Sequence, residues 1–451
     1  MASAAAFYPA QPRRTPDWQG TWRGFFGERL RNTVYGWPEP AFDVTMRTRK
    51  VLGFTVHIVS APDAVERVML GNKVNYERPG IARRILSPLI GNGLLSAEGE
   101  DWRKQRKIVA PTFAPGAVAK MAPLMDAAAL REIAQWNQGS GRIDIAPAAT
   151  RTTMAIIADA LFGGDSRLLD PAASRHIETM LAAAGKARFT TMLGLQDFDP
   201  SPEMRRARKS RAWLRATLTE LVAQRGPDGG PDDFFGGLIR ALHAQFPPEE
   251  AAALAVDNAI TFYVAGHETT SNALAWTAYC LAAQPALQEQ CRKEALDSLV
   301  LPAEERAAAL PLLHQVLEES MRLYPPAPRW DREAIGSDEL AGVAVAKGDL
   351  VSIWPWVIHR HRKLWPDPDR FDHTRFAPEN RAKLHRFQYL PFGAGPRVCV
   401  GARFATVEAL LILARWLEAR RFSVPSGWRP DPVGSVTLRP RGGMILRAEP
   451  V

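Results

Sequence analysis

The chain has 451 residues, of which 46% are hydrophobic and 23% charged, and its formal net charge is +9. This composition is typical of a globular protein with a large core and excludes a disordered chain. The positive charge is spread along the sequence without a nucleic-acid-binding motif, so we expect a solvated basic surface and no nucleic-acid partner. Three cysteines in so long a chain do not form a disulfide framework, which indicates a reducing, cytoplasmic compartment.

The N-terminal segment, residues 1–45, predicts irregular structure because it is rich in proline, arginine, tryptophan and glycine. It contains no run of about 20 apolar residues, so we expect neither a membrane anchor nor a signal peptide. Residues 226–231 are the strongest candidate for a linker, but they are few and lie between helical patterns. We therefore expect one domain spanning residues 1–451, and a monomer.

The first regular elements follow simple patterns. Residues 52–60 alternate between apolar and polar types, which predicts a strand, and a helix follows to about residue 70. Residues 81–95 are apolar but broken by turn signals at Ser87-Pro88 and at Gly91-Asn-Gly93. A helix opens at Glu100, and the patterns between residues 121 and 246 are helical.

The longest helical pattern starts at Pro247 and reaches about Ala283. Four polar residues (Asp257, Asn258, His267 and Glu268) interrupt its apolar run, so a buried central helix fits better than a membrane span. It contains the sequence Ala265-Gly-His-Glu-Thr-Thr270. The hydroxyl of Thr269 can bond the carbonyl of Ala265 and, beside the weak helix former Gly266, open a local bulge. Glu268 and Thr269 offer a carboxylate and a hydroxyl able to transfer protons.

The stretch with the clearest chemistry is Phe392-Gly-Ala-Gly-Pro-Arg-Val-Cys-Val-Gly401, which is followed by a helical pattern. Its three glycines lack a Cβ, so the backbone can approach a flat cofactor and adopt positive φ. Backbone N–H groups can turn toward the sulfur of Cys399, and the positive end of the next helix is expected to lower the thiol pKa. Phe392 offers an aromatic face and Arg397 a cation. Cys280 and Cys291 lie in helical patterns and are expected to be unreactive thiols.

This stretch resembles the haem-binding loop of the cytochrome P-450 family, Phe-x-x-Gly-x-Arg-x-Cys-x-Gly, and meets each fixed position. Further motifs of the family occur in its order: Trp102-x-x-x-Arg106, Ala265–Thr270, Glu319-x-x-Arg322 and a Phe-x-x-x-Arg-Phe run that contains Arg375. The resemblance implies a mostly α fold with a small β lobe. In it, haem b lies between the proximal cysteine loop and the long central helix. The chain is similar to the soluble, bacterial members of the family.

The resemblance also implies roles for single residues. Cys399 would be the axial iron ligand, and Glu268 with Thr269 the catalytic acid–alcohol pair. Residues implied to contact the haem are Trp102, Arg106, Arg332, Ala265, Phe392, Gly393, Arg397 and Gly401. Residues implied to brace the core are Glu319, Arg322 and Arg375, although His373 stands where the family usually has proline. His359 fits a propionate contact and a buried structural histidine equally well. Residues expected to line a substrate pocket are Ile81, Leu89, Leu94, Phe262 and Ala265, and the turn of a hairpin at residues 437–444 would enter it.

The implied activity is insertion of one oxygen atom from O2 into a small hydrophobic substrate, with fatty acids, terpenoids and aromatic compounds left open. No flavin domain or iron–sulfur cysteine cluster is present in the sequence, so we expect electrons from a ferredoxin or flavodoxin and its reductase. The expected docking cations are Arg103, Lys104, Lys107 and Arg403. Two alternatives are a peroxide-driven or isomerising haem enzyme and a haem-binding sensor. The Glu268-Thr269 pair argues against both.

Overall fold

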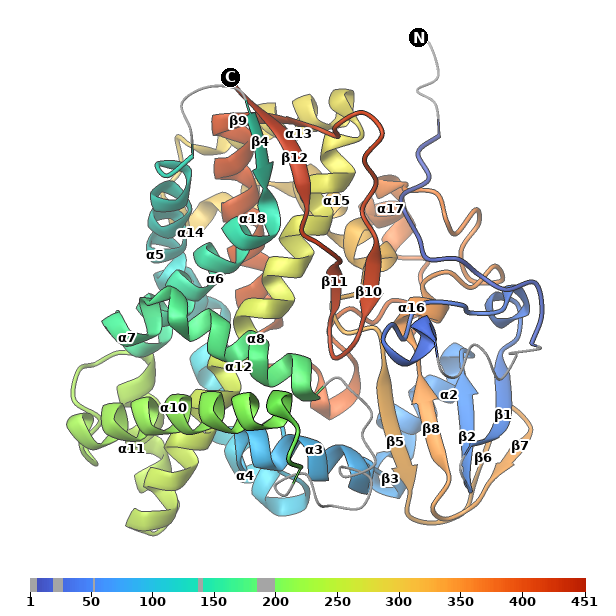
Figure 1. Ribbon diagram of the computed structural model, residues 1–451, viewed down its shortest axis with the longest axis horizontal. Helices are drawn as coiled ribbons and strands as arrows, with labels where there is room; N and C mark the ends of the chain where they lie inside the picture. Colours follow the sequence, from blue (N-terminus) through green and yellow to red (C-terminus); the bar gives the residue numbers. More distant parts are fainter. Residues whose placement is uncertain (1–5, 19–26, 52, 137–140, 185–198) are drawn as a thin grey trace.

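A single long helix, α12 (Pro248–Ala282), crosses the helical part of the molecule (Figure 1). It begins with proline at its first position and two glutamates in its first turn, which suit the free N–H groups and positive dipole of a helix start. Helices α6, α10, α11, α15 and α18 pack around it. The predicted central helix is thus confirmed, with its start and end within one residue of the expected bounds.

The computed structural model describes residues 6–18, 27–51, 53–136, 141–184 and 199–451. Its remaining α-helices are α2 (Pro62–Glu66), α3 (Gly80–Ile90), α4 (Gly99–Val109), α5 (Pro115–Ile133), α6 (Ile145–Phe162), α7 (Ser166–Leu169), α8 (Pro171–Ala184), α10 (Pro202–Arg225), α11 (Phe234–His243), α13 (Pro285–Ser298), α14 (Ala303–Arg306), α15 (Pro311–Leu323), α16 (Pro355–Ile358), α17 (Pro378–Arg381) and α18 (Ala402–Ala419). Short 3-10 or π turns are η1 (Glu28–Leu30), η2 (Glu39–Phe42), η3 (Arg67–Gly71), η4 (Lys73–Asn75), η5 (Ala110–Phe113), η7 (Ala307–Ala309), η8 (His373–Phe376) and η9 (Gly395–Arg397).

Polar side chains cap several of these helices. Asp144 accepts the N–H of Ala146 at the start of α6, and Asp233 accepts that of Gly236 at the start of α11. Ser201 does the same for α10. Each oxygen satisfies an N–H that has no partner within its helix, which fixes where the helix begins.

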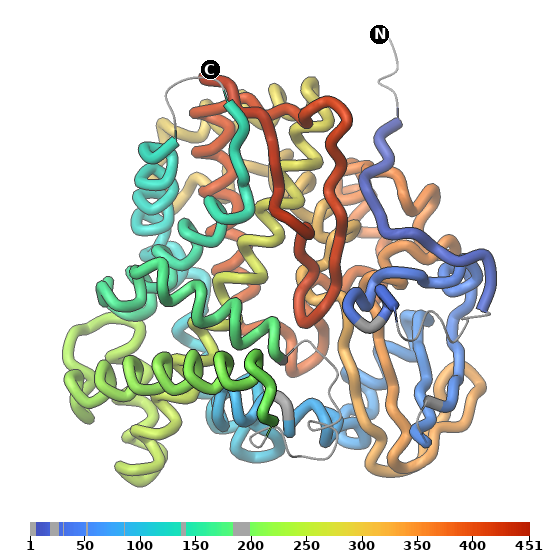
Figure 2. Tube along the Cα trace, viewed as in Figure 1, coloured from blue at the N-terminus to red at the C-terminus, as the bar shows by residue number. Residues whose placement is uncertain are grey.

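The β lobe is a five-stranded sheet at one side of the molecule, in the order β1-β2-β8-β5-β3 (Figures 1 and 2). Its strands are β1 (Met46–Val51), β2 (Phe54–Val59), β3 (Tyr76–Glu77), β5 (Trp330–Ala334) and β8 (Leu350–Ile353). The pair β2–β8 is parallel, and the others are antiparallel. The smaller sheets are β4 (Gly141–Asp144) with β12 (Ile445–Pro450) and β9 (Arg420–Ser423), β6 (Asp338–Leu340) with β7 (Val343–Val345), and β10 (Pro432–Gly434) with β11 (Leu438–Pro440). The mostly α fold with a small β lobe is therefore confirmed.

Two local expectations were wrong. Residues 80–90 form one helix, α3, without a turn at Ser87-Pro88. Pro88 sits in the last turn, so the helix gives up little more than the hydrogen bond of the missing N–H. Strand β4 lies within residues 121–246, which we expected to be helical, because it is short and pairs with the distant β12.

Hydropathy gives a mixed result for membrane crossing. Among the described residues, no single helix has the length and apolar character needed to cross a bilayer. The segments Gly99–Phe113 and Pro115–Ile133, bent by 57° at their junction, satisfy the same criterion when they are taken together.

Candidate active site at the Cys399 loop and helix α12

The loop before α18 carries Cys399, which is exposed. The Cys399 N–H donates to the carbonyl of Phe392 at 2.9 Å, which closes the loop, and the N–H of Gly401 points to the sulfur. Cys399 is accessible although protein surrounds it, whereas Cys280 and Cys291 are buried. Burial raises the pKa of both of these thiols, so they remain protonated and inert.

The expected fall in the thiol pKa of Cys399 is not found. Burial raises the pKa of this thiol, and the Gly401 N–H and the cation of Arg106 oppose the rise without cancelling it. Enclosure by protein therefore outweighs the helix start that follows the loop. Because a thiolate is the form that binds a metal, an iron ion at this position would have to displace the thiol proton.

The three glycines of the loop lack a Cβ for different structural reasons. Gly393 and Gly395 adopt φ of +72° and +66°, and a Cβ on Gly395 would lie 2.0 Å from the carbonyl oxygen of Met69. Gly401 has φ of −87°, so the expected positive φ is wrong there. It precedes α18 directly, and a Cβ would meet the ring of Phe113 at an ordinary 3.7 Å.

Arginine side chains gather beside this loop around the carboxylate of Glu98. The guanidinium of Arg397 lies 4.4 Å from the ring centre of Trp102, pairs with Glu98 and donates to the carbonyl of Ala97 at 3.0 Å. Nε of Arg78 lies 3.7 Å from the same carboxylate. Nη1 of Arg78 is buried and has no hydrogen-bond partner among the described residues. Arg78 was not predicted as a site residue, because no local sequence motif contains it.

These arginines form a site for anions. Burial lowers the pKa of Arg78 and Arg397 to about 10, and it also lowers that of Arg332, which is electrostatically coupled to Arg397 and Glu98. An arginine keeps its proton in proteins, so a buried cluster of this kind requires negative partners. The two propionates of a haem meet that need, and the unpartnered Nη1 of Arg78 fits a carboxylate ligand. Arg106 is half-buried on α4; burial lowers its pKa, and the charge of Cys399 opposes this effect.

Helix α12 contributes an exposed alanine in a stretch that is otherwise mostly buried. Ala265 is exposed, while Val264 and His267 beside it are buried. The hydroxyl of Thr269 donates to the carbonyl of Ala265 at 2.9 Å, as expected. The helix nevertheless stays α-helical from Pro248 to Ala282, so the expected bulge does not interrupt it. Glycine is needed at position 266 for close packing instead, because a Cβ there would lie 2.4 Å from Cδ1 of Ile157.

Glu268 bonds to a residue that the sequence did not single out as part of the site. Oε1 of Glu268 accepts the hydroxyl of Thr437 at 2.7 Å, while Oε2 is buried without a partner among the described residues. Burial raises the pKa of Glu268, and the Thr437 hydrogen bond and the cation of Arg439 oppose the rise. Thr437 lies in the turn between β10 and β11, so the terminal hairpin spans residues 432–440 and not 437–444.

The three residues expected to brace the core do meet. Nε and Nη2 of Arg322 donate to the carboxylate of Glu319 at 2.6 and 2.7 Å, and both side chains are fully buried. Nε of Arg375 lies 3.6 Å from the same carboxylate. The remaining donors of Arg322 reach the carbonyls of His359, Pro368 and Arg370. The buried pair is thus fully partnered, which a charge pair in a core requires.

His359 is a buried structural histidine. Its Nδ1 lies 3.1 Å from the carbonyl of Arg322, and its Nε2 accepts the N–H of Leu390 at 2.8 Å. Burial holds its pKa well below the ordinary value. Both ring nitrogens are therefore used by the backbone, and a propionate contact is excluded for this ring orientation.

The residues expected in a substrate pocket lie in different settings. Phe262 is buried, with its ring 5.8 Å from that of Phe113 and 5.7 Å from that of Phe234. Leu94 is also buried. Leu89 is partly buried against the main core, and Ile81 is exposed on α3.

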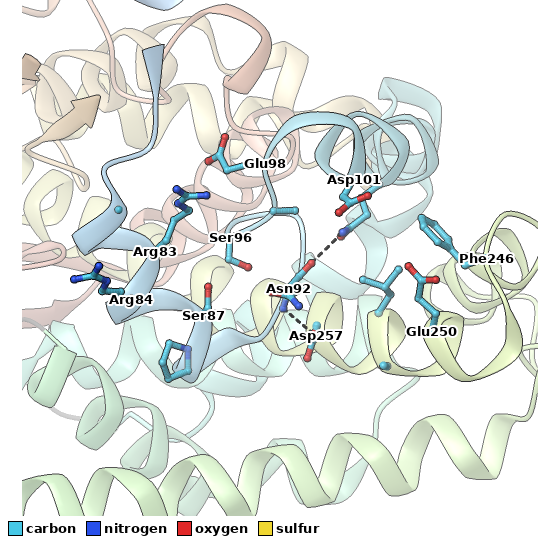
Figure 3. A pocket seen from close by; sticks show the side chains of 16 residues that line it. Arg83, Arg84, Ser87, Asn92, Ser96, Glu98, Asp101, Phe246, Glu250 and Asp257 are labelled. Atoms are coloured by element: carbon cyan, nitrogen blue, oxygen red, sulfur yellow. Dashed lines mark hydrogen bonds between the residues drawn. The ribbon is translucent and has the colours of Figure 1, made fainter. Parts of the chain in front are cut away.

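An open groove of about 780 Å³ lies nearby, between α3, α4 and the start of α12 (Figure 3). Arg83 and Arg84 stand on its α3 side, and Asp257 and Glu250 belong to α12 on the other side. The N–H of Asn92 donates to Asp257 at 2.7 Å across its floor. The residues that line this groove are mostly polar and include neither Cys399 nor Ala265, but Glu98 of the arginine cluster borders it.

The sequence matches the family model described as Cytochrome P450 over residues 45–447. Cyclooctatin synthase of Streptomyces melanosporofaciens is 29% identical over 401 residues, which cover 88% of this chain and 85% of that protein. Cyclooctat-9-en-7-ol 5-monooxygenase of the same organism is 30% identical over 394 residues, covering 85% and 82%. Human cytochrome P450 4F12 is 28% identical over 422 residues, covering 87% and 80%.

Solved structures give the same picture of the fold. The haem domain of cytochrome P450DA superposes with a TM-score of 0.79 at 24% identity and covers 90% of each chain. A cytochrome P450 described as CYP102L1 superposes with a TM-score of 0.77 at 26% identity, covering 92% of this chain and 93% of that one. Since the family model spans most of the sequence and the relatives align over nearly all of it, this chain belongs to the cytochrome P450 family of haem-thiolate enzymes and is a monooxygenase.

Proposed function

We propose that the enzyme hydroxylates a C–H bond of a small hydrophobic substrate: R–H + O2 + 2 electrons + 2 protons give R–OH + H2O. The observation that carries this proposal is the pairing of an accessible Cys399 thiol with an acid–alcohol pair on the buried helix α12. Haem with an axial thiolate supplies the activation of dioxygen, because the thiolate donates electron density that favours O–O cleavage. The chain supplies the ligand, the pocket and the protons.

The cofactor contacts follow from the arginine cluster and the glycine loop. We assign Cys399 as the axial ligand. The haem propionates are proposed to bind Arg332, Arg397 and Arg78, with Trp102 packed against Arg397. Arg106, four residues after Trp102 on the same face of α4, is proposed as a further propionate contact. Phe392, Gly393, Gly401 and Ala265 would border the ring of the cofactor.

Glu268 and Thr269 are proposed to deliver the two protons. Glu268 is largely buried, and burial raises its pKa, which favours the protonated form that a proton donor requires. The Thr269 hydroxyl is bonded to its own helix at 2.9 Å, so it has one orientation from which to accept and pass a proton. A positioned acid of this kind typically contributes about 10²–10⁴-fold to a rate.

Substrate and electron donor are inferred more broadly. One relative is named for cyclooctat-9-en-7-ol and another for leukotriene-B4, and we propose an apolar organic substrate here as well. Leu89 and Ala265 are the expected pocket residues that stay available for contact. Electrons are proposed to come from an acidic ferredoxin or flavodoxin with its reductase, in the cytoplasm.

Reconstitution tests this function against its main alternative. The purified holoenzyme is incubated with a panel of hydrophobic compounds preselected by their spectral shift on binding. One arm receives NADPH, ferredoxin and ferredoxin reductase, and the other receives hydrogen peroxide alone. We expect hydroxylated product in the first arm, with one NADPH oxidised per product when coupling is complete. Turnover confined to the peroxide arm would assign the chain to the peroxide-driven class instead.

A further inference from the structure

The carboxyl group of Glu268 is held by a residue from the far end of the chain. Thr437 is 169 residues away in sequence, and its hydroxyl donates to Oε1 of Glu268 at 2.7 Å. Thr437 is itself buried, with 8% of its surface exposed. A short, buried hydrogen bond of this type fixes both partners, because no water competes for either.

Among the described residues, no other group forms a hydrogen bond with the carboxyl of Glu268. Its second oxygen, Oε2, is buried and unpartnered among the described residues. Two charged groups on other elements, Arg439 on β11 and Glu178 on α8, act on Glu268 through their electric field. On the same helix, Nδ1 of the neighbouring His267 is 2.8 Å from the carbonyl of Tyr263 and so is engaged elsewhere. The Thr437 hydroxyl is thus the contact that orients the carboxyl.

The hairpin that carries Thr437 is itself anchored. The N–H of Ser435 donates to the carbonyl of Thr437 at 2.9 Å, which closes the turn. The N–H of Leu438 donates to the carbonyl of Pro326 at 3.0 Å, and the indole of Trp276 on α12 donates to the carbonyl of Leu438 at 3.4 Å. Thr437 therefore has a fixed place against α12, from which it can set the position of the Glu268 carboxyl.

We propose that Thr437 is a positioning residue for proton delivery: by holding Oε1 of Glu268 against the terminal hairpin, it leaves Oε2 as the oxygen that passes protons to the active site. This inference rests on the proposed monooxygenase function. Glu268 takes up one proton from the solvent side for each proton that it releases, so the residue is unchanged after turnover. Thr437 makes no bond to the reacting atoms and acts through Glu268.

The same turn exposes an apolar side chain beside Thr437. Val436 is 44% exposed, whereas the adjacent Thr437 is turned inward to α12. A substrate that contacts Val436 would lie next to Thr437, the residue that orients Glu268. The position of Thr437 therefore links the hairpin to proton supply.

The test compares Thr437→Val, which keeps the shape and removes the hydroxyl, with Thr437→Ser, which keeps the hydroxyl. A hydrogen bond to the charged form of a carboxyl lowers its pKa, so its loss should raise the pKa of Glu268 further. We expect product formed per NADPH to fall about three- to tenfold in Thr437→Val, in line with one lost hydrogen bond, and to recover in Thr437→Ser. The pH at which coupling is half-maximal should move upward in Thr437→Val and stay in place in Thr437→Ser.

A second readout does not depend on turnover. Infrared difference spectra of the holoenzyme across a pH series report the C=O stretch of the protonated carboxyl, and its loss in Glu268→Gln assigns the band. The midpoint of that band should rise in Thr437→Val and not in Thr437→Ser. Should Thr437→Val lose haem or unfold, Thr437→Ala carries the same prediction.

The outcomes distinguish the proton relay through Glu268 from the positioning role of Thr437. If Glu268→Gln leaves coupling unchanged, the relay in the proposed function is wrong and the positioning role falls with it. If Glu268→Gln uncouples turnover while coupling, pH profile and infrared midpoint in Thr437→Val all match the unmodified enzyme, the relay stands and the role of Thr437 is overturned.

Discussion

At the scale of single residues, enclosure decides what each cysteine can do. Cys280 and Cys291 are buried within α12 and α13, and burial raises the pKa of both thiols, although Ser320 opposes the rise at Cys280. Cys399 is also enclosed, but its sulfur is accessible, receives the N–H of Gly401 and lies in the field of Arg106. These two interactions favour the charged sulfur that an iron ligand must provide.

We predict that Cys399→Ala removes the thiolate signature of the haem. The ferrous protein with CO should show the red-shifted Soret band of a thiolate ligand, and the variant should lack it. Cys280→Ala is the matched control, because it removes a buried thiol from α12 at a cost of about 1 kcal/mol in stability or somewhat more and should leave the band in place. A band that persists in Cys399→Ala would assign the axial ligand to another residue.

The residues that the sequence could identify are those whose partners are near in the chain. The loop around Cys399 and the pair Glu319 and Arg322 are recognisable because their spacing is local. Arg78 could not be found in this way, and Thr437 was expected only as part of the hairpin at residues 437–444. Arg78 is brought to the anion site by the end of strand β3, and Thr437 meets Glu268 through a hairpin 169 residues away. Both depend on tertiary packing that no short pattern encodes.

At the scale of elements, the interface between α12 and α18 contains a buried acid. Glu408 on α18 is fully buried, and neither of its oxygens has a hydrogen-bond partner among the described residues. Burial raises its pKa well above the ordinary value, and the hydroxyl of Thr270 on α12 opposes this rise. The raised pKa favours the neutral form of Glu408, which avoids the penalty of a buried charge.

This arrangement predicts how stability changes with pH. Because the folded state keeps the Glu408 proton to a higher pH than the unfolded state does, the free energy of unfolding falls as pH rises above the ordinary glutamate value, until the folded group also ionises. Glu408→Gln is neutral at all pH values, so its stability should decline less between pH 5 and pH 8. Urea unfolding of both proteins across this range measures the difference. Parallel pH profiles would show that Glu408 is not the group responsible.

Secondary-structure elements with local sequence signals were predicted, whereas one that forms by distant strand pairing was not. The long helix α12 and strand β2 were predicted because apolar periodicity and an early proline are local signals. Strand β4 was missed because its four residues acquire their conformation by pairing with β12, about 300 residues later. The bulge expected at Thr269 is absent from the helix although the side-chain bond forms, since one such bond can coexist with regular α-helical geometry.

At the scale of the whole molecule, α4 and α18, which both carry exposed cations, are joined by packing near the cysteine loop. The turn η5 continues α4 and brings Phe113 within 6.1 Å of the ring of Phe404 on α18 and against Gly401. Lys104 and Lys107 of α4 and Arg403 of α18 are exposed, and the ammonium of Lys104 lies 5.9 Å from the ring centre of Phe246. Arg103 is exposed as well, although it pairs with Glu100 at 3.0 Å.

A surface of this sign should attract an acidic electron donor and guide it to the ligand side of the haem. Charge steering raises association rates and weakens as salt screens it, over a Debye length of about 10 Å at 0.1 M. We therefore predict that Arg103→Glu, Lys104→Glu and Lys107→Glu together slow reduction by ferredoxin by at least tenfold while substrate affinity is unchanged, and that added salt slows reduction of the unmodified enzyme. Reversal of Arg205, Arg206 and Lys209, three exposed cations on α10, is the matched control for net charge. Stopped-flow reduction at several salt concentrations gives the rates. An equal loss in both triple variants would reduce the effect to overall charge, and unchanged rates in the α4 variant would move the docking surface away from α4.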